Sequence, residues 1–202
     1  MDVIRGAEIT VCTPHIPPRK TEIMRCVNSV SAQTYPAFAH IITTDVYKEG
    51  AAKTRQRALD AVSTPWVAFL DDDDMFMPNH LEDLIKFALD WNYDFVYSWF
   101  KIMKGGIVYE NDPVFPPGHY LDPWDPENPR HTTVTTLVKT DLAKEAEFIM
   151  PDEGGIYEDG MRSNEDWGFI ERCNKMGTIG HLVQKTWYWC HDKNTSGLPS
   201  RW

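Results

Sequence analysis

The sequence predicts an α/β domain built on a mostly parallel sheet, with helices on both faces of that sheet. Segments rich in β-branched residues alternate with segments of helical periodicity through the first half of the chain, which is the pattern of such sheets. Residues 66–70, WVAFL, form a short continuous apolar run, as expected of a strand buried on both faces. Polar side chains directly follow several of the strands, at the sheet edge where α/β domains bind ligands.

The first half of the chain has the more regular pattern. Strands are expected where β-branched and apolar residues cluster, at 8–13, 38–45, 66–70 and 94–100. Helices are expected where apolar residues recur at spacing three or four, at 20–33, at 50–62 and from Pro78 onward. Pro78 suits the start of a helix, because the first helical N–H groups have no partner in any case.

The second half is less regular and adds a smaller, antiparallel part to the predicted sheet. Two stretches rich in turn-forming residues predict loops, at 110–131 and 150–163. The other segments predict a strand at 132–140, a short helix at 142–148, a helix at 164–176 and an aromatic strand from Thr186 to His191. No repeat or linker interrupts the chain, so we expect residues 1–202 to form a single domain.

Composition disfavours several classes of protein. The net charge of −10 opposes a general electrostatic grip on nucleic acid or an anionic membrane, although nucleic acid stays open as a substrate. No window approaches the roughly 18 uninterrupted apolar residues of a membrane span, and the N-terminus shows no charged-then-apolar leader. The four cysteines form no CxxC pair, so reduced thiols are expected. We therefore expect a cytoplasmic protein without a membrane span.

Four consecutive aspartates, Asp71 to Asp74, follow the apolar strand at 66–70. Carboxylate oxygens are preferred ligands of hard divalent cations such as Mg²⁺ and Mn²⁺. If the strand geometry continues, alternate residues share a side, so Asp71 and Asp73 point together and Asp72 faces away. The alternative is an acidic cap for the helix that begins near residue 78, a role that Asp74 alone could fill.

Arg55 lies on the inward stripe of the helix predicted at 50–62. A guanidinium that faces the sheet needs a carboxylate or phosphate partner, and Asp71 is the candidate within the chain. The alternative is an arginine at the margin of the helix whose charged end reaches solvent. We place Arg55 among the candidate ligand-binding residues.

Two acids and one histidine in the second half could take part in chemistry. Glu165 and Asp166 stand in the first turn of a predicted helix, where the helix dipole favours the ionised form. An ionised carboxylate can accept a proton from a hydroxyl group, although acids are common at helix starts without such a role. His191 could complete a metal site or simply end a strand.

Taken in order, these segments resemble the family 2 glycosyltransferases, which have the GT-A fold. The opening ITVCTPHIPP and the stop SAQTYP are similar to the first nucleotide-binding strand and helix of that family. KTRQRALDAVSTPWVAFLDDDDMFMPNHLEDL is similar to its central acidic block, NEDWGFIERC to its acceptor-side ED motif, and WCHDKNTS to its closing histidine. Two departures are TRQ in place of the usual ARN, and a second strand that ends in one acid, TTDVYKEG.

The resemblance implies a donor site in residues 1–100, for a nucleotide-diphosphate sugar. Thr13 and Pro14 would contact the nucleobase, together with Asp45 at the end of the second strand. Asp71 and Asp72 would lie beside the ribose and the diphosphate. The donor side would also include Arg55.

The resemblance further implies that the metal and the acceptor are handled by residues nearer the C-terminus. Asp73, joined by His191, would bind the divalent cation, Mn²⁺ or Mg²⁺. Asp166 would be the general base of an inverting transfer to an acceptor hydroxyl, and Glu165 and Trp167 would shape the acceptor site in residues 101–202. The acceptor could be a glycan, a lipid-linked sugar, a protein, a metabolite or a modified nucleic-acid base. Residues 151–160 would be a candidate lid.

Two other functions stay open at this point. A nucleotidyltransferase or pyrophosphorylase-like enzyme can also hold metal with aspartates at strand ends, but such enzymes usually open with a glycine-rich phosphate loop, and TPHIPPRK has no glycine. A non-catalytic module that binds nucleotide sugars is the second alternative. The sequence names neither the sugar, the nucleobase nor the oligomeric state.

Overall fold

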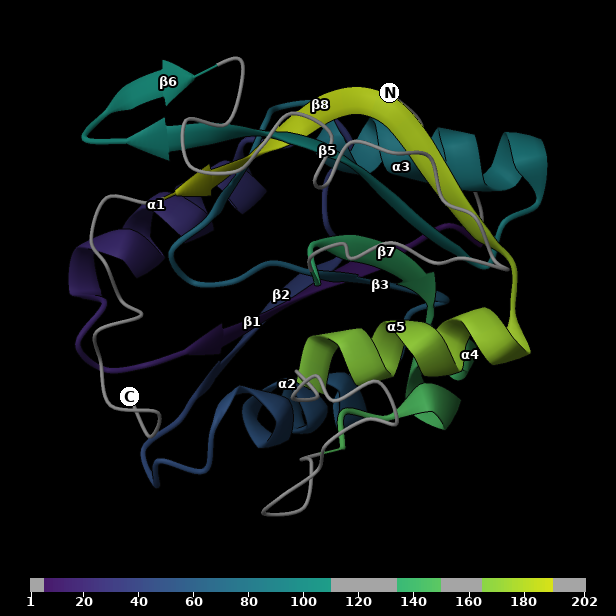
Figure 1. Cartoon of the computed structure of the whole chain (residues 1–202), viewed down its shortest axis with the longest axis horizontal. Coiled ribbons are helices and arrows are strands. Elements are labelled where there is room, and N and C mark those ends of the chain that lie inside the picture. Colours follow the sequence, from purple (N-terminus) through teal and green to yellow (C-terminus); the bar gives the residue numbers. More distant parts are fainter. Residues whose placement is uncertain (1–5, 110–133, 150–164, 191–202) are drawn as a thin grey trace, which may run out of the picture.

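The computed structural model describes residues 6–109, 134–149 and 165–190, which form one α/β domain (Figure 1). The strands are β1 (Ile9–His15), β2 (Ala39–Thr44), β3 (Trp66–Phe69), β4 (Met75–Phe76), β5 (Phe95–Lys104), β6 (Ile107–Tyr109), β7 (Thr136–Lys139) and β8 (Ile179–Cys190). The helices are α1 (Lys20–Ser31), α2 (Ala51–Asp60), α3 (His80–Trp91), α4 (Thr140–Ala146) and α5 (Glu165–Met176).

The described strands join in a single eight-stranded sheet of order β2-β1-β3-β7-β5-β8-β4, and β6 pairs with β5. β1, β2 and β3 run parallel, and β5 and β8 also pair parallel to each other. β7 is antiparallel to both of its neighbours, β3 and β5, so those two neighbours run in the same direction. The mostly parallel sheet is therefore confirmed, with strands from both halves of the sequence inside it.

The prediction of an antiparallel C-terminal part is only partly correct. β7 is antiparallel, and β8 pairs antiparallel with β4, but β8 runs parallel to its long neighbour β5. The reason is the route of the chain, because β8 is entered from α5 and not through a tight hairpin. A strand reached over a helix can join its neighbour in parallel.

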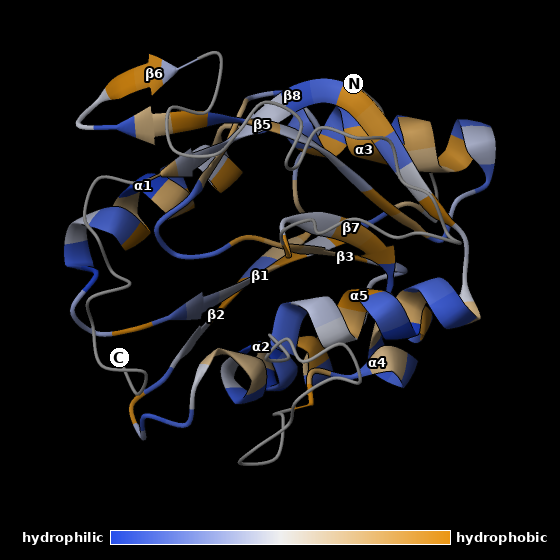
Figure 2. Ribbon diagram, viewed as in Figure 1, coloured by the Kyte–Doolittle hydropathy of each residue, from blue (hydrophilic) through white to orange (hydrophobic). Residues whose placement is uncertain are grey.

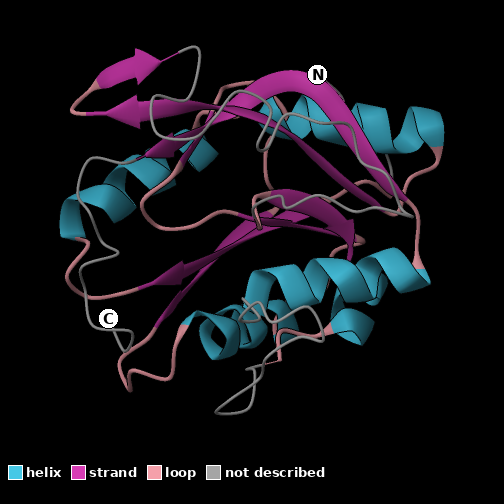
Figure 3. Ribbon diagram, in the orientation of Figure 1, coloured by secondary structure: helices cyan, strands magenta, loops and turns pink. Residues whose placement is uncertain are grey.

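Helices cover both faces of the sheet, as Figures 1 and 3 show. Along β3, Trp66 and Ala68 belong to a core cluster that includes residues of α1 and α3. Val67 and Phe69 belong to a second cluster that includes residues of α2, α4 and α5. A strand that alternates between two apolar layers must be apolar at every position, which explains the continuous run WVAFL. Figure 2 shows hydrophobic residues, in orange, along the central strands and many hydrophilic residues, in blue, on α5.

Some elements differ from their predicted bounds. β4 and β6 were not predicted, since two or three residues are too few for a periodicity to show. β8 begins at Ile179, well before the predicted start at Thr186, because its first residues lack the aromatic signature of its end. α3 begins at His80, two residues after Pro78. The loops predicted at 110–131 and 150–163 lie outside the described residues, and so does His191.

A series of buried contacts between polar side chains joins the start of α3 to the sheet. The ring of His80 stacks on that of Phe76, with centroids 4.0 Å apart, and its Nδ1 lies 2.7 Å from Oγ1 of Thr186. Thr186 Oγ1 in turn lies 2.6 Å from Oγ of Ser98. Burial lowers the pKa of His80 to about 3, so the imidazole stays neutral in the folded protein.

His80 should therefore make the protein less stable in acid. Below about pH 6.5 the unfolded chain protonates this histidine while the folded chain does not, so the free energy of unfolding should fall as the pH is lowered. The contribution is at most ~1.4 kcal/mol per pH unit. Over the interval from pH 6.5 to 5, the loss of stability measured by urea unfolding should be smaller in His80→Gln than in the wild type by about 1.6 kcal/mol. His40, whose pKa is also lowered by burial, stays in both proteins as an internal reference. Equal pH slopes would contradict the assignment.

Candidate active site

The aspartates occupy the turn between β3 and β4, which we call the aspartate turn (residues 71–74). β3 lies in the middle of the sheet, next to β1, whereas β4 pairs with β8 at the other end of the strand order. The turn therefore crosses the edge at which β1 and β3 end. It is closed by a backbone hydrogen bond from the N–H of Asp74 to the carbonyl of Asp71, 3.1 Å long.

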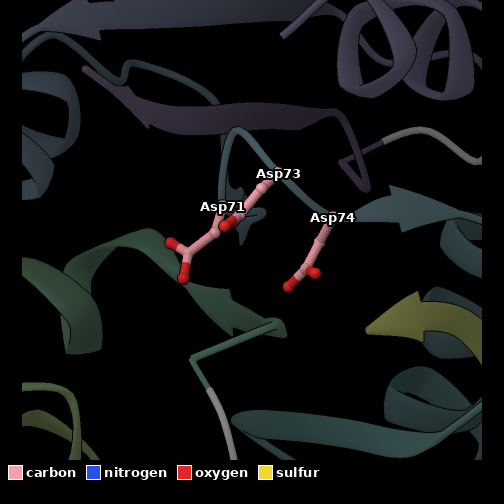
Figure 4. Close-up of side chains that lie close together, drawn as sticks. All are labelled: Asp71, Asp73 and Asp74. Atoms are coloured by element: carbon pink, nitrogen blue, oxygen red, sulfur yellow. The ribbon is translucent and has the colours of Figure 1, made fainter. Parts of the chain in front are cut away.

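Three of the four carboxylates gather on one side of this turn. Asp71, Asp73 and Asp74 each offer one oxygen, and these oxygens lie within 4.8 Å of one another (Figure 4). Asp71 and Asp73 thus point together and Asp72 faces elsewhere, as predicted. The reason differs from the one given for the sequence, because the strand geometry does not continue and the residues form a turn. The turn brings in Asp74, for which the sequence had suggested only a capping role.

Asp72 ties the turn to the end of β1. One of its oxygens accepts hydrogen bonds from the backbone N–H of Ile16, at 3.0 Å, and pairs with Nδ1 of His15, at 2.8 Å. The other oxygen pairs with Arg19, which also reaches Asp73 at 3.0 Å. The side chain of Asp72 is only 1% exposed, so these partners take the place of water. The contacts of His15 and Arg19 with Asp72 were not predicted from the sequence. The one signal that could have indicated them is that both residues flank Ile16 to Pro18, a segment that its two prolines make rigid.

Arg55 holds the aspartate turn from the other side. As predicted, α2 directs it inward to Asp71, and its Nη2 lies 2.6 Å from Oδ1 of that residue. Its Nη1 also lies 2.8 Å from Oε1 of Glu165, a contact that was not predicted. Burial alone would lower the pKa of Arg55, but Asp71, Glu165 and Asp166 outweigh burial and raise it. The guanidinium is therefore permanently charged.

The positive charge of the neighbouring arginines does not fully offset the negative charge of these carboxylates. Burial raises the pKa of Asp73 to about 6, with Arg19 opposing the rise and Asp71 and Asp72 adding to it. Burial, then the charges of Asp73 and Asp71, raise the pKa of Asp74 well above its usual value. Asp74 still accepts a hydrogen bond from the N–H of Cys190, at 2.8 Å, which fixes its carboxylate at the end of β8.

The donor set fits a hard divalent cation. Carboxylate oxygens are the ligands that Mg²⁺ and Mn²⁺ prefer, and such ions keep several positions for water or phosphate oxygens. Carboxylates that repel one another at close range ionise together more readily when a cation offsets their charge. Asp71, Asp73 and Asp74 would hold the ion. His191, predicted to join them, lies outside the described residues.

Asp166 stands in the first turn of α5, next to Glu165. Its Oδ1 accepts a hydrogen bond from the N–H of Trp167, at 2.8 Å. Burial raises the pKa of Asp166, and Arg55 opposes that rise. Trp167 is 9% exposed and belongs to the core cluster under α2, α4 and α5, so it supports this turn from inside. Its acceptor contact stays a prediction.

The residues predicted to meet the nucleobase are engaged within the fold. Both oxygens of Asp45 accept backbone hydrogen bonds, from Glu49 and Gly50, each 2.9 Å long. Asp45 thereby orders the approach to α2. Thr13 is buried, and its Oγ1 lies 2.9 Å from Nε2 of His40. Pro14 follows it in β1, paired in register with Thr43 of β2. Their nucleobase contacts stay predictions.

Known proteins are similar to this chain in sequence and in fold. Residues 39–135, which include β2, α2, β3 and the aspartate turn, match the family model described as glycosyl transferase family 2. Over this region, the chain is similar to the family 2 glycosyltransferases. Its fold agrees with that of TarS from S. aureus, in the crystal structure of residues 1–349 in complex with UDP-GlcNAc, with a TM-score of 0.74 at 17% sequence identity. That match covers 95% of this chain and 61% of the TarS chain.

Two curated proteins match parts of this chain. One is the Escherichia coli protein UDP-Glc:alpha-D-GlcNAc-diphosphoundecaprenol beta-1,3-glucosyltransferase WfgD, 36% identical over 67 residues. The other is an uncharacterized glycosyltransferase from Haemophilus influenzae, 29% identical over 122 residues. The matches span 33% and 48% of this chain, but only 26% and 42% of the two relatives. None of the helices in the described ranges is both long and apolar enough to cross a membrane.

Arg19 should be important for stability, since it is the chief cation beside the buried Asp72. Arg19→Ala should lower the free energy of unfolding by about 3 kcal/mol, the usual cost of removing one partner of a buried ion pair. Chemical denaturation measures the loss. Arg57→Ala is the matched control, because it removes an exposed arginine paired with Glu49 and should cost no more than ~1 kcal/mol. Equal effects of the two substitutions would contradict the structural role of Arg19.

Proposed function

We propose that this chain transfers a sugar from a nucleotide-diphosphate sugar to an acceptor hydroxyl, with inversion at the anomeric carbon and with a divalent cation bound at the aspartate turn. One observation carries the proposal: one oxygen each of Asp71, Asp73 and Asp74 lies within 4.8 Å of the others, and Arg55 joins this group to the first turn of α5, which holds Asp166. A cation site and a candidate base are thus connected by one side chain.

The cation and the base have complementary tasks in such a reaction. A bound divalent cation would stabilise the negative charge that develops on the departing nucleoside diphosphate. Asp71, Asp73 and Asp74 would hold it against the diphosphate. Asp166 would accept the proton of the acceptor hydroxyl as that oxygen attacks the anomeric carbon, from the side opposite the leaving group.

The environment of Asp166 suits a general base. Burial raises its pKa towards the working pH, which improves its strength as a proton acceptor. The positive charge of Arg55 and the start of α5 act in the other direction and keep the carboxylate ionised when no substrate is bound. Glu165 is occupied with Arg55, so Asp166 is the better candidate of the two acids.

The donor class is supported by the names of similar proteins. The TarS structures include complexes with UDP and with UDP-GlcNAc, and the name of the Escherichia coli relative contains UDP-Glc. A uracil nucleotide is therefore the first donor to test. The acceptor is proposed only as a hydroxyl compound, because the matched regions are short parts of the curated relatives.

The proposed reaction predicts release of UDP that depends on a cation. Purified protein with Mn²⁺ and a panel of UDP-sugars should release UDP by slow transfer to water, and chelation of the metal should stop it. Asp73→Asn should reduce the rate by roughly a hundredfold or more, because it weakens the stabilisation of the leaving group. Coupled detection of UDP measures the rate. Release of sugar 1-phosphate from the UDP-sugar, or of pyrophosphate when UTP and a sugar 1-phosphate are supplied instead, would favour the nucleotidyltransferase, and binding without turnover the non-catalytic module.

The role of Asp166 can be tested separately from donor binding. Asp166→Asn should lower kcat by about 10²–10⁴-fold, the usual contribution of a general base. Its affinity for UDP with Mn²⁺, measured by calorimetry, should stay close to that of the wild type. A variant that keeps full kcat, or that loses UDP binding in parallel with kcat, would exclude Asp166 as the base.

A further inference from the structure

Arg55 connects two parts of the candidate active site that lie far apart in the sequence. It is 16 residues from Asp71 and 110 residues from Glu165, and its two Nη groups donate one hydrogen bond to each. Asp71 belongs to the aspartate turn, the proposed place of the donor and its cation. Glu165 is the first residue of α5 and the neighbour of Asp166, the proposed base.

The guanidinium group of Arg55 is held firmly while its partners stay accessible. The Arg55 side chain is 5% exposed, and its Cζ lies 5.9 Å from the ring centroid of Phe148. The side chains of Asp71 and Glu165 are 31% and 27% exposed. A ligand can therefore reach either carboxylate without displacing the arginine from the fold.

The two ion pairs of Arg55 cannot be independent, because they share one positive charge. A divalent cation beside Asp71 offsets the charge of that carboxylate and weakens its attraction for Arg55. The interaction of Arg55 with Glu165 then gains in relative strength. When Arg55 is held less by Asp71, it can pair more closely with Glu165. This closer ion pair restrains the first turn of α5, where the N–H groups have no partners within the helix.

We propose that Arg55 is a positioning residue that couples binding at the aspartate turn to the order of the first turn of α5. The inference rests on the proposed function and adds a connection between its donor and acceptor sides. Binding of nucleoside diphosphate with a cation restrains Glu165 through Arg55, and with it the adjacent Asp166. The base is thereby positioned once the donor is in place, ready to accept the proton of the acceptor hydroxyl.

Hydrogen exchange of α5 tests this coupling without any acceptor or turnover. In an α-helix the N–H groups of Phe169 and Ile170 bond to the carbonyls of Glu165 and Asp166, so their exchange reports opening of the first turn. In the wild type, saturating UDP with Mn²⁺ should slow this exchange by about threefold, a factor within the range of a single partly exposed ion pair. Calorimetry on the same samples confirms saturation.

Variants separate the coupling from general damage. Glu165→Gln leaves Arg55 and Asp71 in place but removes the charge that Arg55 holds on α5, so UDP with Mn²⁺ should bind without slowing the exchange. Arg55→Met should also abolish the response, and Arg55→Lys, which keeps the charge but cannot contact both partners in the same geometry, should restore only part of it. Arg57→Ala, on the same helix and paired with Glu49, should respond like the wild type.

The outcomes distinguish this inference from the proposed function. If Glu165→Gln binds UDP with Mn²⁺ and keeps the full wild-type response, the coupling does not run through Arg55 and the inference is overturned. Binding to the wild type with no change in α5 exchange overturns it as well, while leaving the proposed function intact. If neither UDP nor Mn²⁺ binds to the wild type, the proposed function fails, and the inference fails with it.

Discussion

Two arginines neutralise a tract of like charges, and the arrangement of the candidate site depends on that neutralisation. Arg19 pairs with Asp72 and Asp73, and Arg55 pairs with Asp71. Without these guanidinium groups, adjacent carboxylates at the end of a buried strand would repel one another and draw in water. With them, one carboxylate is turned into the fold and three are left together on the other side of the turn. The cation deficit that remains is the chemical reason for proposing a metal at this place.

The same two arginines explain how distant segments meet at one edge of the sheet. Arg19 brings the loop after β1 to the aspartate turn, and Arg55 brings α2 and the first turn of α5 to it. Parallel strands align their carboxyl ends, but they do not by themselves fix the segments that follow. Ion pairs between largely buried side chains add that second level of order.

Sequence patterns predicted the framework and part of the site. Alternating strands and helices indicated the parallel sheet, and the helical phase of α2 together with the end of β3 indicated the pair of Arg55 with Asp71. The contact of Arg55 with Glu165 has no local signal, because 110 residues separate the two. Asp74 was missed since strand alternation does not hold in a turn. Asp45, in contrast, was predicted from its place at a strand end, but both of its oxygens accept hydrogen bonds from backbone N–H groups of its own loop.

The aspartate turn is anchored at both of its ends, and this has a consequence for its tolerance of insertions and deletions. β3 is in fixed register with β1, and β4 is in fixed register with β8. An extra or a missing residue between them could not be absorbed by sliding either strand, because sliding by one position would exchange the two faces of that strand. The strain would fall on the carboxylates themselves. The length of this segment is thus constrained as tightly as its charge.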